Sequence, residues 1–310
     1  MDMLNTQCAV YNHNIMRKII MFSKYRKKET IMALILIAPS VIGLLIFYII
    51  PFIGMIIYSF FDSPLNGNFV SFQNYIDLLK NEAYKQAVKN TAIFTGISVP
   101  LIVVISLLLS LLLNSKIHFS HGFRTAFIVP LVVPVASVII FFELLFDYRG
   151  FLNSFFQMFD IAPIDWLNSS YAMIAVITIY IWKNVGYNIV LFLAGLQGIP
   201  KEYYEAASID GAGPVAKFFN ITLVYLMPTT FFVVIISIIN SFKVFREVYL
   251  LAGDYPHQSI YMLQHYINNA FRKLDYHKLV TAAILMTLVV YIFVFILFKV
   301  QKRINDAIGN

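Results

Sequence analysis

Long stretches of apolar residues dominate the chain and alternate with short polar segments. A helix that crosses the hydrocarbon core of a bilayer needs about 20 mostly apolar residues, because all its backbone polar groups must be satisfied within the helix. Six stretches meet this requirement and predict an all-α integral membrane protein with six transmembrane helices. They are Ile31–Phe61, Asn90–Asn114, Thr125–Phe146, Tyr171–Gln197, Ile221–Phe242 and Leu279–Phe298.

Basic residues before the first stretch predict the orientation of the chain. Lysines and arginines cluster between residues 17 and 28, and cytoplasmic flanks are the ones enriched in these residues. The N terminus is therefore expected inside, and six crossings return the C terminus to the same side. The first stretch exceeds one crossing, and we expect Pro39 and Pro51 to bend it. The predicted regions are a cytoplasmic segment (1–30), a transmembrane domain (31–300) and a cytoplasmic tail (301–310).

Composition supports a membrane protein and narrows the class. Hydrophobic residues make up 60% of the chain and charged residues 13%, whereas soluble domains have roughly 25% charged residues. The net charge of +7 is attributed to basic residues that orient the protein in the membrane rather than to residues that bind nucleic acid. No basic run with interleaved aromatics stands on a polar surface. The single cysteine, Cys8, excludes a disulfide framework and a cysteine-based metal cluster.

Sequence patterns of catalytic sites are missing. No Gly-Lys dipeptide occurs, so the chain has no P-loop and does not hydrolyse ATP by that route. The histidines form no H-E-x-x-H pattern, and no G-x-S-x-G motif is present. We therefore expect neither an enzyme nor a metal or cofactor site in this chain.

One cytoplasmic loop, residues 198–220, has a distinctive pattern. Pro200 precedes an acidic, alanine-containing segment that favours a short helix. Gly211 and Gly213 are expected to end that helix, and Pro214 to begin a second one. A short surface helix with small side chains suits docking in a groove of a partner protein. The alternative is a plain connection between two spans.

The same loop resembles a known family motif. Glu205-Ala206-Ala207, followed after three residues by Gly211 and after nine more by Ile221, resembles the EAA loop of binding-protein-dependent ABC importer permeases. The extended form is similar to the carbohydrate-uptake branch that includes the maltose-type permeases. The resemblance covers roughly residues 30–300. The supporting segments are Asp210-Gly211-Ala212-Gly213, Ile221-Thr222-Leu223, Phe123–Pro130, Ser241–Phe245 and Tyr249–Leu251.

The sequence departs from the family pattern at two places. Val224 stands where a proline commonly follows the Ile-x-Leu segment, and Pro228 lies four residues later. The Gly-Gly-Pro of the outer loop is replaced by Asp254-Tyr255-Pro256. The geometry expected at the entry to the fifth span, and in the outer loop, therefore departs from the family pattern.

The resemblance implies a type I ABC importer permease fold and a set of partners. These are a second permease subunit in a heterodimer, two ATPase subunits that bind ATP-Mg, and an extracytoplasmic solute-binding protein, all at a bacterial cytoplasmic membrane. Glu205 is expected to make the charged contact to the ATPase, with Ala206 and Ala207 as close-packing positions. Gly211 is expected to form the turn, and Asp210 and Gly213 complete the motif.

Polar side chains within the fourth and fifth predicted spans are candidates for the solute path, because such residues are costly in lipid and usually face a cavity or a partner. Their positions match solute-contacting positions of maltose-type permeases. Hydrogen bonding between helices is the competing interpretation. Lys183 is expected to pair with Glu143, bind an acidic sugar or lie at the partner interface. The candidates are Tyr180, Lys183, Asn184, Tyr187, Asn188, Ser237, Asn240 and Ser241.

Three other functions compete with a sugar permease. An ion-coupled secondary transporter would need a relay of titratable residues across the bilayer. Glu143 and Lys183 alone are too few to form one. A membrane-embedded enzyme lacks a catalytic set. A permease for amino acids or peptides is disfavoured by the Asp210-Gly211-Ala212-Gly213 form.

Overall fold

The computed structural model describes residues 30–63, 67–115 and 120–308. It divides the chain into two compact units, Met1–Ser59 and Phe60–Asn310. The predicted basic cluster at residues 17–28 and Cys8 lie outside the described residues.

The first unit contains one apolar helix, Thr30–Tyr58. A π-helical turn, η1 (Leu45–Ile49), interrupts it just before α2 (Ile50–Tyr58). The backbone N–H of Ile50 donates to the Leu45 carbonyl, five residues back. Pro51 has no N–H and its ring crowds the preceding turn, so it breaks the regular i to i−4 pattern at this point.

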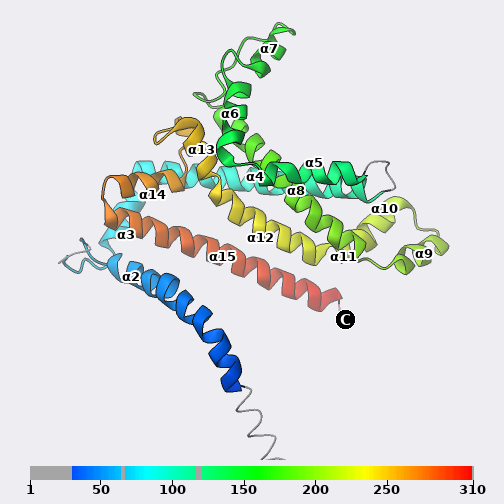
Figure 1. Cartoon of the computed structure of the whole chain (residues 1–310), viewed down its shortest axis with the longest axis horizontal. Helices are drawn as coiled ribbons and strands as arrows, with labels where there is room; N and C mark the ends of the chain where they lie inside the picture. The colour runs from blue at the N-terminus through cyan, green and yellow to red at the C-terminus, as the bar shows by residue number, and fades with distance from the viewer. Residues whose placement is uncertain (1–29, 64–66, 116–119, 309–310) are drawn as a thin grey trace, which may run out of the picture. The chain divides into compact units, whose positions relative to one another are not determined.

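The second unit is a helical bundle, and its only bridge among the described residues is the isolated pair Phe61–Phe69. Its long helices are α4, α8, α12 and α15, which lie alongside one another (Figure 1). The elements of this unit are α3 (Gln73–Lys80), α4 (Glu82–Asn114), α5 (Ser120–Val132), α6 (Val135–Phe146), α7 (Phe151–Gln157), α8 (Ala172–Gln197), α9 (Lys201–Ile209), α10 (Pro214–Lys217), η2 (Phe218–Thr222), α11 (Leu223–Tyr225), α12 (Met227–Lys243), α13 (Phe245–Ala252), η3 (Gln258–Ile260), α14 (Leu263–Arg272) and α15 (Tyr276–Ile308).

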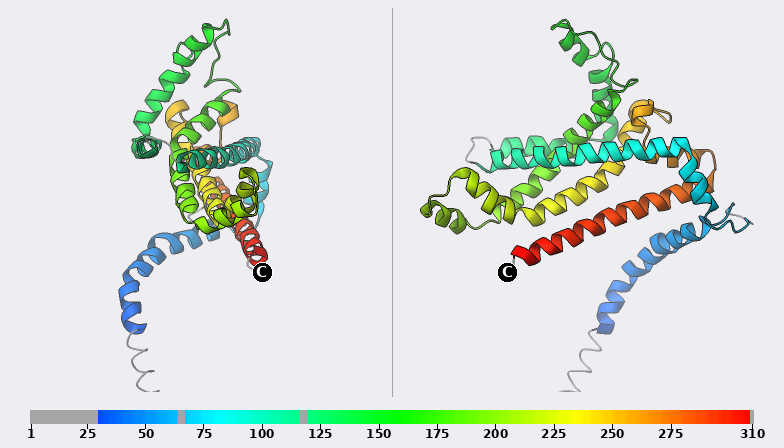
Figure 2. Two further views of the ribbon diagram at one scale, coloured as in Figure 1. Left: turned by 90° about the vertical axis from the view of Figure 1, so that its right-hand side faces the viewer. Right: turned by 180° about the vertical axis from the view of Figure 1, so that it is seen from behind.

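Within the described residues, five helices are long and apolar enough to cross a membrane, and a bent pair would make a sixth. The bent pair is the third predicted span, in which Thr125–Val132 and Val135–Gln157 meet at 105°. Pro134 is the N-cap of α6 and separates the two helices. The two halves diverge in Figure 2, where α6 and α7 extend away from the long helices.

The helical region at the fifth span extends beyond the apolar stretch that predicted it. The sequence pattern places its end at Phe242, whereas the helical region runs from Met227 to Ala252. The predicted span ended at Phe242 because Lys243 follows it, and charged residues normally mark the end of a span. This correction places α13 within the bundle and brings its charged residues close to α8.

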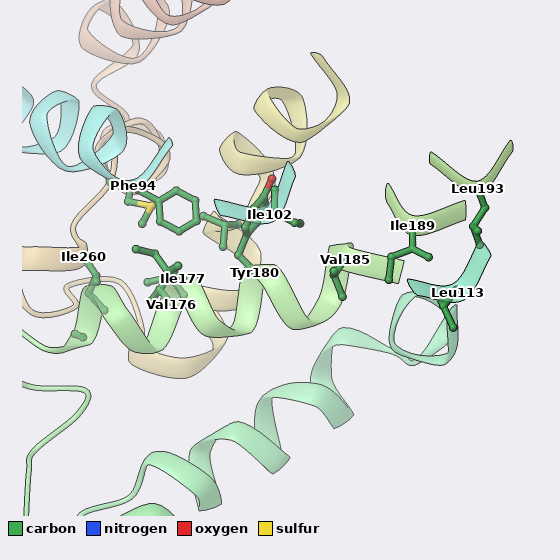
Figure 3. Close-up of a cluster of buried hydrophobic side chains, with 14 residues drawn as sticks. Phe94, Ile102, Leu113, Val176, Ile177, Tyr180, Val185, Ile189, Leu193 and Ile260 are labelled. Carbon is green, nitrogen blue, oxygen red and sulfur yellow. The ribbon is translucent and has the colours of Figure 1, made fainter. Parts of the chain in front are cut away.

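The main core lies between α4, α8 and the α12–α13 region (Figure 3). Phe94 on α4 meets Tyr180 on α8 edge to face, with ring centroids 5.4 Å apart. The helices α5 and α8 approach unusually closely at Gly186, where a Cβ would lie 1.7 Å from the Phe127 carbonyl oxygen. Only glycine fits this contact, which fixes α5 against the middle of α8.

Candidate functional site

The predicted docking loop forms a helix, a tight turn and a second helix. Gly211 has φ 78°, in the left-handed region that glycine adopts without steric cost. The Ala212 N–H donates to the Ala207 carbonyl at 2.8 Å, and the Gly211 N–H donates to the Ser208 carbonyl at 3.2 Å. This pair of bonds is the Schellman arrangement that closes a helix C terminus. Pro214 then occupies the first turn of α10, as its fixed φ favours.

Two side-chain contacts hold α9 against the segment that leads into the fifth span. The hydroxyl groups of Tyr204 and Thr222 lie 2.9 Å apart, and Thr222 is buried at η2. The Lys217 ammonium donates to the Ser208 hydroxyl at 2.6 Å. Because α9 is anchored at both contacts, a force applied to it would reach α11 and α12 directly.

The opposite side of α9 faces away from the bundle. Glu205 and Ala206 are exposed, and Ala207 is half-buried. Ile209 is 87% exposed and Val215 on α10 is 68% exposed. Ile209 was not among the predicted docking residues, although it lies four residues after Glu205 and three after Ala206, on the same helical face. Exposed apolar residues beside an acidic one are typical of a protein-binding surface.

A second site is a polar cavity of about 210 Å³ in the α8, α12 and α13 region. Four of its lining residues belong to the predicted solute path: Tyr180, Lys183, Asn184 and Asn240. Lys183 lies eleven residues from the start of α8, about 17 Å along its axis, and so sits deep within the span. The lining residues are Leu131, Tyr180, Lys183, Asn184, Asn240, Lys243, Val244, Arg246 and Glu247.

Lys183 forms an ion pair with Glu247 of α13. Of the three roles expected for Lys183, the pairing with Glu143 is therefore wrong, and Glu143 is exposed on α6. Sequence reasoning missed Glu247 because it placed this residue in an outer loop. The available signal was spacing: Asn240, Lys243 and Glu247 lie at i, i+3 and i+7, which continues one polar helical face beyond the apolar run.

Four of the predicted solute residues instead hold the helices together. The Tyr180 hydroxyl donates to the Ser237 carbonyl at 2.7 Å, and the Asn188 amide donates to the Ser237 hydroxyl at 2.9 Å. Ser241 and Thr95 have hydroxyl groups 2.9 Å apart, which joins α12 to α4. Tyr180, Asn188, Ser237 and Ser241 are each 1% exposed, and their hydrogen bonds favour the interhelical interpretation, although Tyr180 also lines the cavity.

The remaining candidates have accessible side chains. The Asn184 amide donates to the Tyr180 carbonyl at 2.8 Å, and Asn184 and Asn240 are half-buried in the cavity lining. Tyr187 is half-buried and lies outside that lining. The two asparagines therefore offer amide groups where a solute could reach them.

The segment between α13 and α15 contains a compact group of charged and aromatic residues. Asp254, at the position where the family motif is altered, forms an ion pair with Arg272, which raises the pKa of that guanidinium. His265 is fully buried against Phe245, and burial lowers the pKa of its imidazole to about 4. The Met262 N–H donates to His265 Nδ1 at 3.3 Å, so His265 is an acceptor in its neutral form.

An apolar cavity of about 340 Å³ lies among α4, α12 and α15. Its two threonines are already engaged: Thr91 accepts from the Leu263 N–H at 2.9 Å, and Thr95 contacts Ser241. A hydroxyl-rich solute would compete with these existing bonds, so the polar cavity is the better candidate site.

Comparisons with known proteins agree with this architecture. Residues 90–308 match the family described as binding-protein-dependent transport system inner membrane component. The arabinooligosaccharides transport system permease protein AraP of Bacillus subtilis (strain 168) is 33% identical, over 69% of this chain and 70% of that protein. The sulfoquinovosyl glycerol transport system permease protein SmoG of Agrobacterium fabrum (strain C58 / ATCC 33970) is 31% identical, over 77% and 80%.

A solved structure shows the same fold. It is a crystal structure of a bacterial ABC transporter involved in the import of the acidic polysaccharide alginate, with a TM-score of 0.77 at 21% identity. The match covers 91% of this chain and 98% of that one. The type I importer permease fold expected from the sequence is thus confirmed. The chain belongs to the family of binding-protein-dependent transport system inner membrane components, and it is a multi-pass membrane protein.

Proposed function

We propose that this chain is a permease subunit of an ATP-driven importer for a sugar or oligosaccharide. It forms half of the translocation path together with a second permease subunit. Two separate ATPase subunits supply the energy from ATP-Mg, and an extracytoplasmic binding protein delivers the solute. The chain itself binds no cofactor, and its N and C termini lie in the cytoplasm.

The observation that carries this proposal is the exposed face of α9. Glu205, Ala206 and Ile209 are exposed, while Tyr204 and Ser208 anchor the helix to the rest of the loop and the fifth span. In the proposed mechanism this face docks on an ATPase, and closure of the ATPase pair moves α9. The contact between Tyr204 and Thr222 passes that movement to the fifth span.

The solute class is supported by the names of the relatives. AraP is named for arabinooligosaccharides and SmoG for sulfoquinovosyl glycerol. Both solutes contain sugar units, although their charges differ. The amide groups of Asn184 and Asn240 suit hydroxyl groups of such solutes.

Co-purification with the ATPase tests the proposal. A tagged chain is expressed together with the second permease subunit and the ATPase. The amount of ATPase that co-purifies is then compared between wild type and Glu205→Arg. We expect Glu205→Arg to lose most of the bound ATPase, because it reverses a charge at the centre of the docking face. Glu82→Arg is the matched control, because Glu82 is exposed at the start of α4 and outside the loop. Absence of any ATPase from the wild-type complex would point to a secondary transporter instead.

A further inference from the structure

The polar cavity has an unbalanced set of charges. Lys183, Lys243 and Arg246 contribute three positive charges to its lining, and Glu247 contributes the one negative charge. Lys183 is neutralised by its ion pair with Glu247. Two cations therefore remain, both placed where α12 meets α13.

Lys243 and Arg246 are exposed and uncompensated. Across residues 30–63, 67–115 and 120–308, none of the ion pairs includes either side chain. They lie three residues apart in a nearly continuous helical segment, so they project from neighbouring positions. Cations within a membrane span are costly unless they face a water-filled path or a negative group.

The neighbours of these cations indicate the kind of negative group. Asn184 and Asn240 line the same cavity and present amide groups that bind hydroxyls. Arginine binds carboxylate, sulfonate and phosphate groups through two parallel hydrogen bonds, and lysine adds a point charge. Complete small-molecule sites usually measure roughly 300–1,000 Å³, so the 210 Å³ cavity is smaller than a complete site, as a permease that forms half of the translocation path requires.

We propose that this cavity receives a sugar-type solute that carries a carboxylate, sulfonate or phosphate group, with Lys243 and Arg246 on the anionic group and the two asparagines on its hydroxyls. The inference rests on the import function proposed above. Its alternative is that an acidic residue of the second permease subunit neutralises the two cations.

Uptake by the whole transporter tests the solute class. The complex of both permeases, the ATPase and the binding protein is reconstituted in liposomes. The probes are trigalacturonate with its neutral methyl ester, sulfoquinovose with glucose, and glucose 6-phosphate with glucose. We measure the initial uptake rate with saturating solute-loaded binding protein, and ATP hydrolysis in the same vesicles. We expect uptake of at least one anionic probe in preference to its neutral counterpart.

The double variant Lys243→Gln with Arg246→Gln tests the site. Its uptake rate for the anionic probe should fall at least about tenfold, the size expected for one lost hydrogen bond between charged groups. ATP hydrolysis stimulated by the binding protein should remain, which shows that the complex has assembled. The double variant Lys243→Arg with Arg246→Lys keeps both charges and should recover part of the uptake that the glutamine variant loses.

Three results would overturn the inference. If only neutral probes are taken up, at equal rates in wild type and the glutamine variant, the proposal of an anionic solute is refuted, while the proposed import function stands. Preferred uptake of an anionic probe that the glutamine variant does not reduce would place the anion site elsewhere. A complex that neither retains an ATPase nor takes up any probe would refute the proposed function, and this inference with it.

Discussion

Lys183 on α8 and Glu247 on α13 form an ion pair inside the bundle, with side chains that are only 17% and 7% exposed. The pair joins the fourth span to the end of the fifth, next to the polar cavity. A buried charge that loses its partner is strongly destabilising, whereas removal of both charges is often neutral.

Substitution of one partner should therefore cost more than substitution of both. We expect Lys183→Met to lower the stability by about 3 kcal/mol, the lower end of the range for a broken buried pair, because the Glu247 carboxylate that is left behind shares the cavity with Lys243 and Arg246. Lys183→Met combined with Glu247→Leu should recover most of this loss. The measurement is the temperature at which detergent-solubilised, fluorescently tagged protein loses its monodisperse elution. Equal losses in the single and double variants would show that the pair does not couple the two helices.

The two asparagines on α8 should respond differently to the same substitution. Asn184 lines the cavity, whereas Asn188 is buried and donates to Ser237. We expect Asn188→Ala to destabilise the protein by about 1–3 kcal/mol, because the Ser237 hydroxyl loses its buried partner. Asn184→Ala should leave thermal stability nearly unchanged but lower solute uptake, while ATPase association persists. Normal uptake by Asn184→Ala would remove it from the solute path.

Gly186 should tolerate no larger side chain. A Cβ at this position would lie 1.7 Å from the Phe127 carbonyl oxygen, so α5 must move away from α8. We expect Gly186→Val to destabilise the bundle by at least about 1–3 kcal/mol, the usual cost of overpacking. Gly96→Val is a matched control, because Gly96 also lies in a span but a Cβ added there would have no neighbouring atom within 4 Å. Thermal elution profiles of the two variants provide the comparison.

The turn after α9 should be sensitive to loss of its glycine. Gly211 has φ 78°, and alanine in the left-handed region costs about 1–2 kcal/mol. We expect Gly211→Ala to displace α9 and reduce ATP hydrolysis stimulated by the binding protein. Gly213→Ala is the control, because Gly213 has φ −71° and open space around it. An equal reduction in both variants would argue against a special role for the left-handed turn.

His265 should make the protein less stable in acid. Burial lowers the pKa of its imidazole from 6.5 to about 4, and Asp254 only partly opposes this shift. A histidine with a lowered folded-state pKa contributes stability above pH 6.5, and that contribution is lost as the pH falls towards 4. The loss amounts to about 3 kcal/mol across this window. His265→Gln should flatten the dependence of thermal stability on pH between about 7 and 4; an unchanged slope would assign acid sensitivity to other groups.

The class of fold and the position of the loop at residues 198–220 both follow from the order of the amino acids alone. Apolar runs of sufficient length predict spanning helices wherever they occur, because lipid leaves few alternatives. The turn at Gly211 was also predictable, since its conformation depends on neighbouring residues only. The family pattern around Glu205 was predictable for the same reason, because it consists of residues that are close together in the sequence.

Which polar residues face a cavity depends on how the helices pack, and the sequence pattern does not show this. Tyr180, Asn184 and Asn188 are close in sequence, but whether each contacts a helix or a cavity depends on how α12 packs against α8. The partner of Lys183 lies 64 residues away on a helix that the hydropathy pattern assigned to a loop. Such pairings depend on contacts between distant segments, and helical periodicity specifies a face of one helix without specifying what covers it.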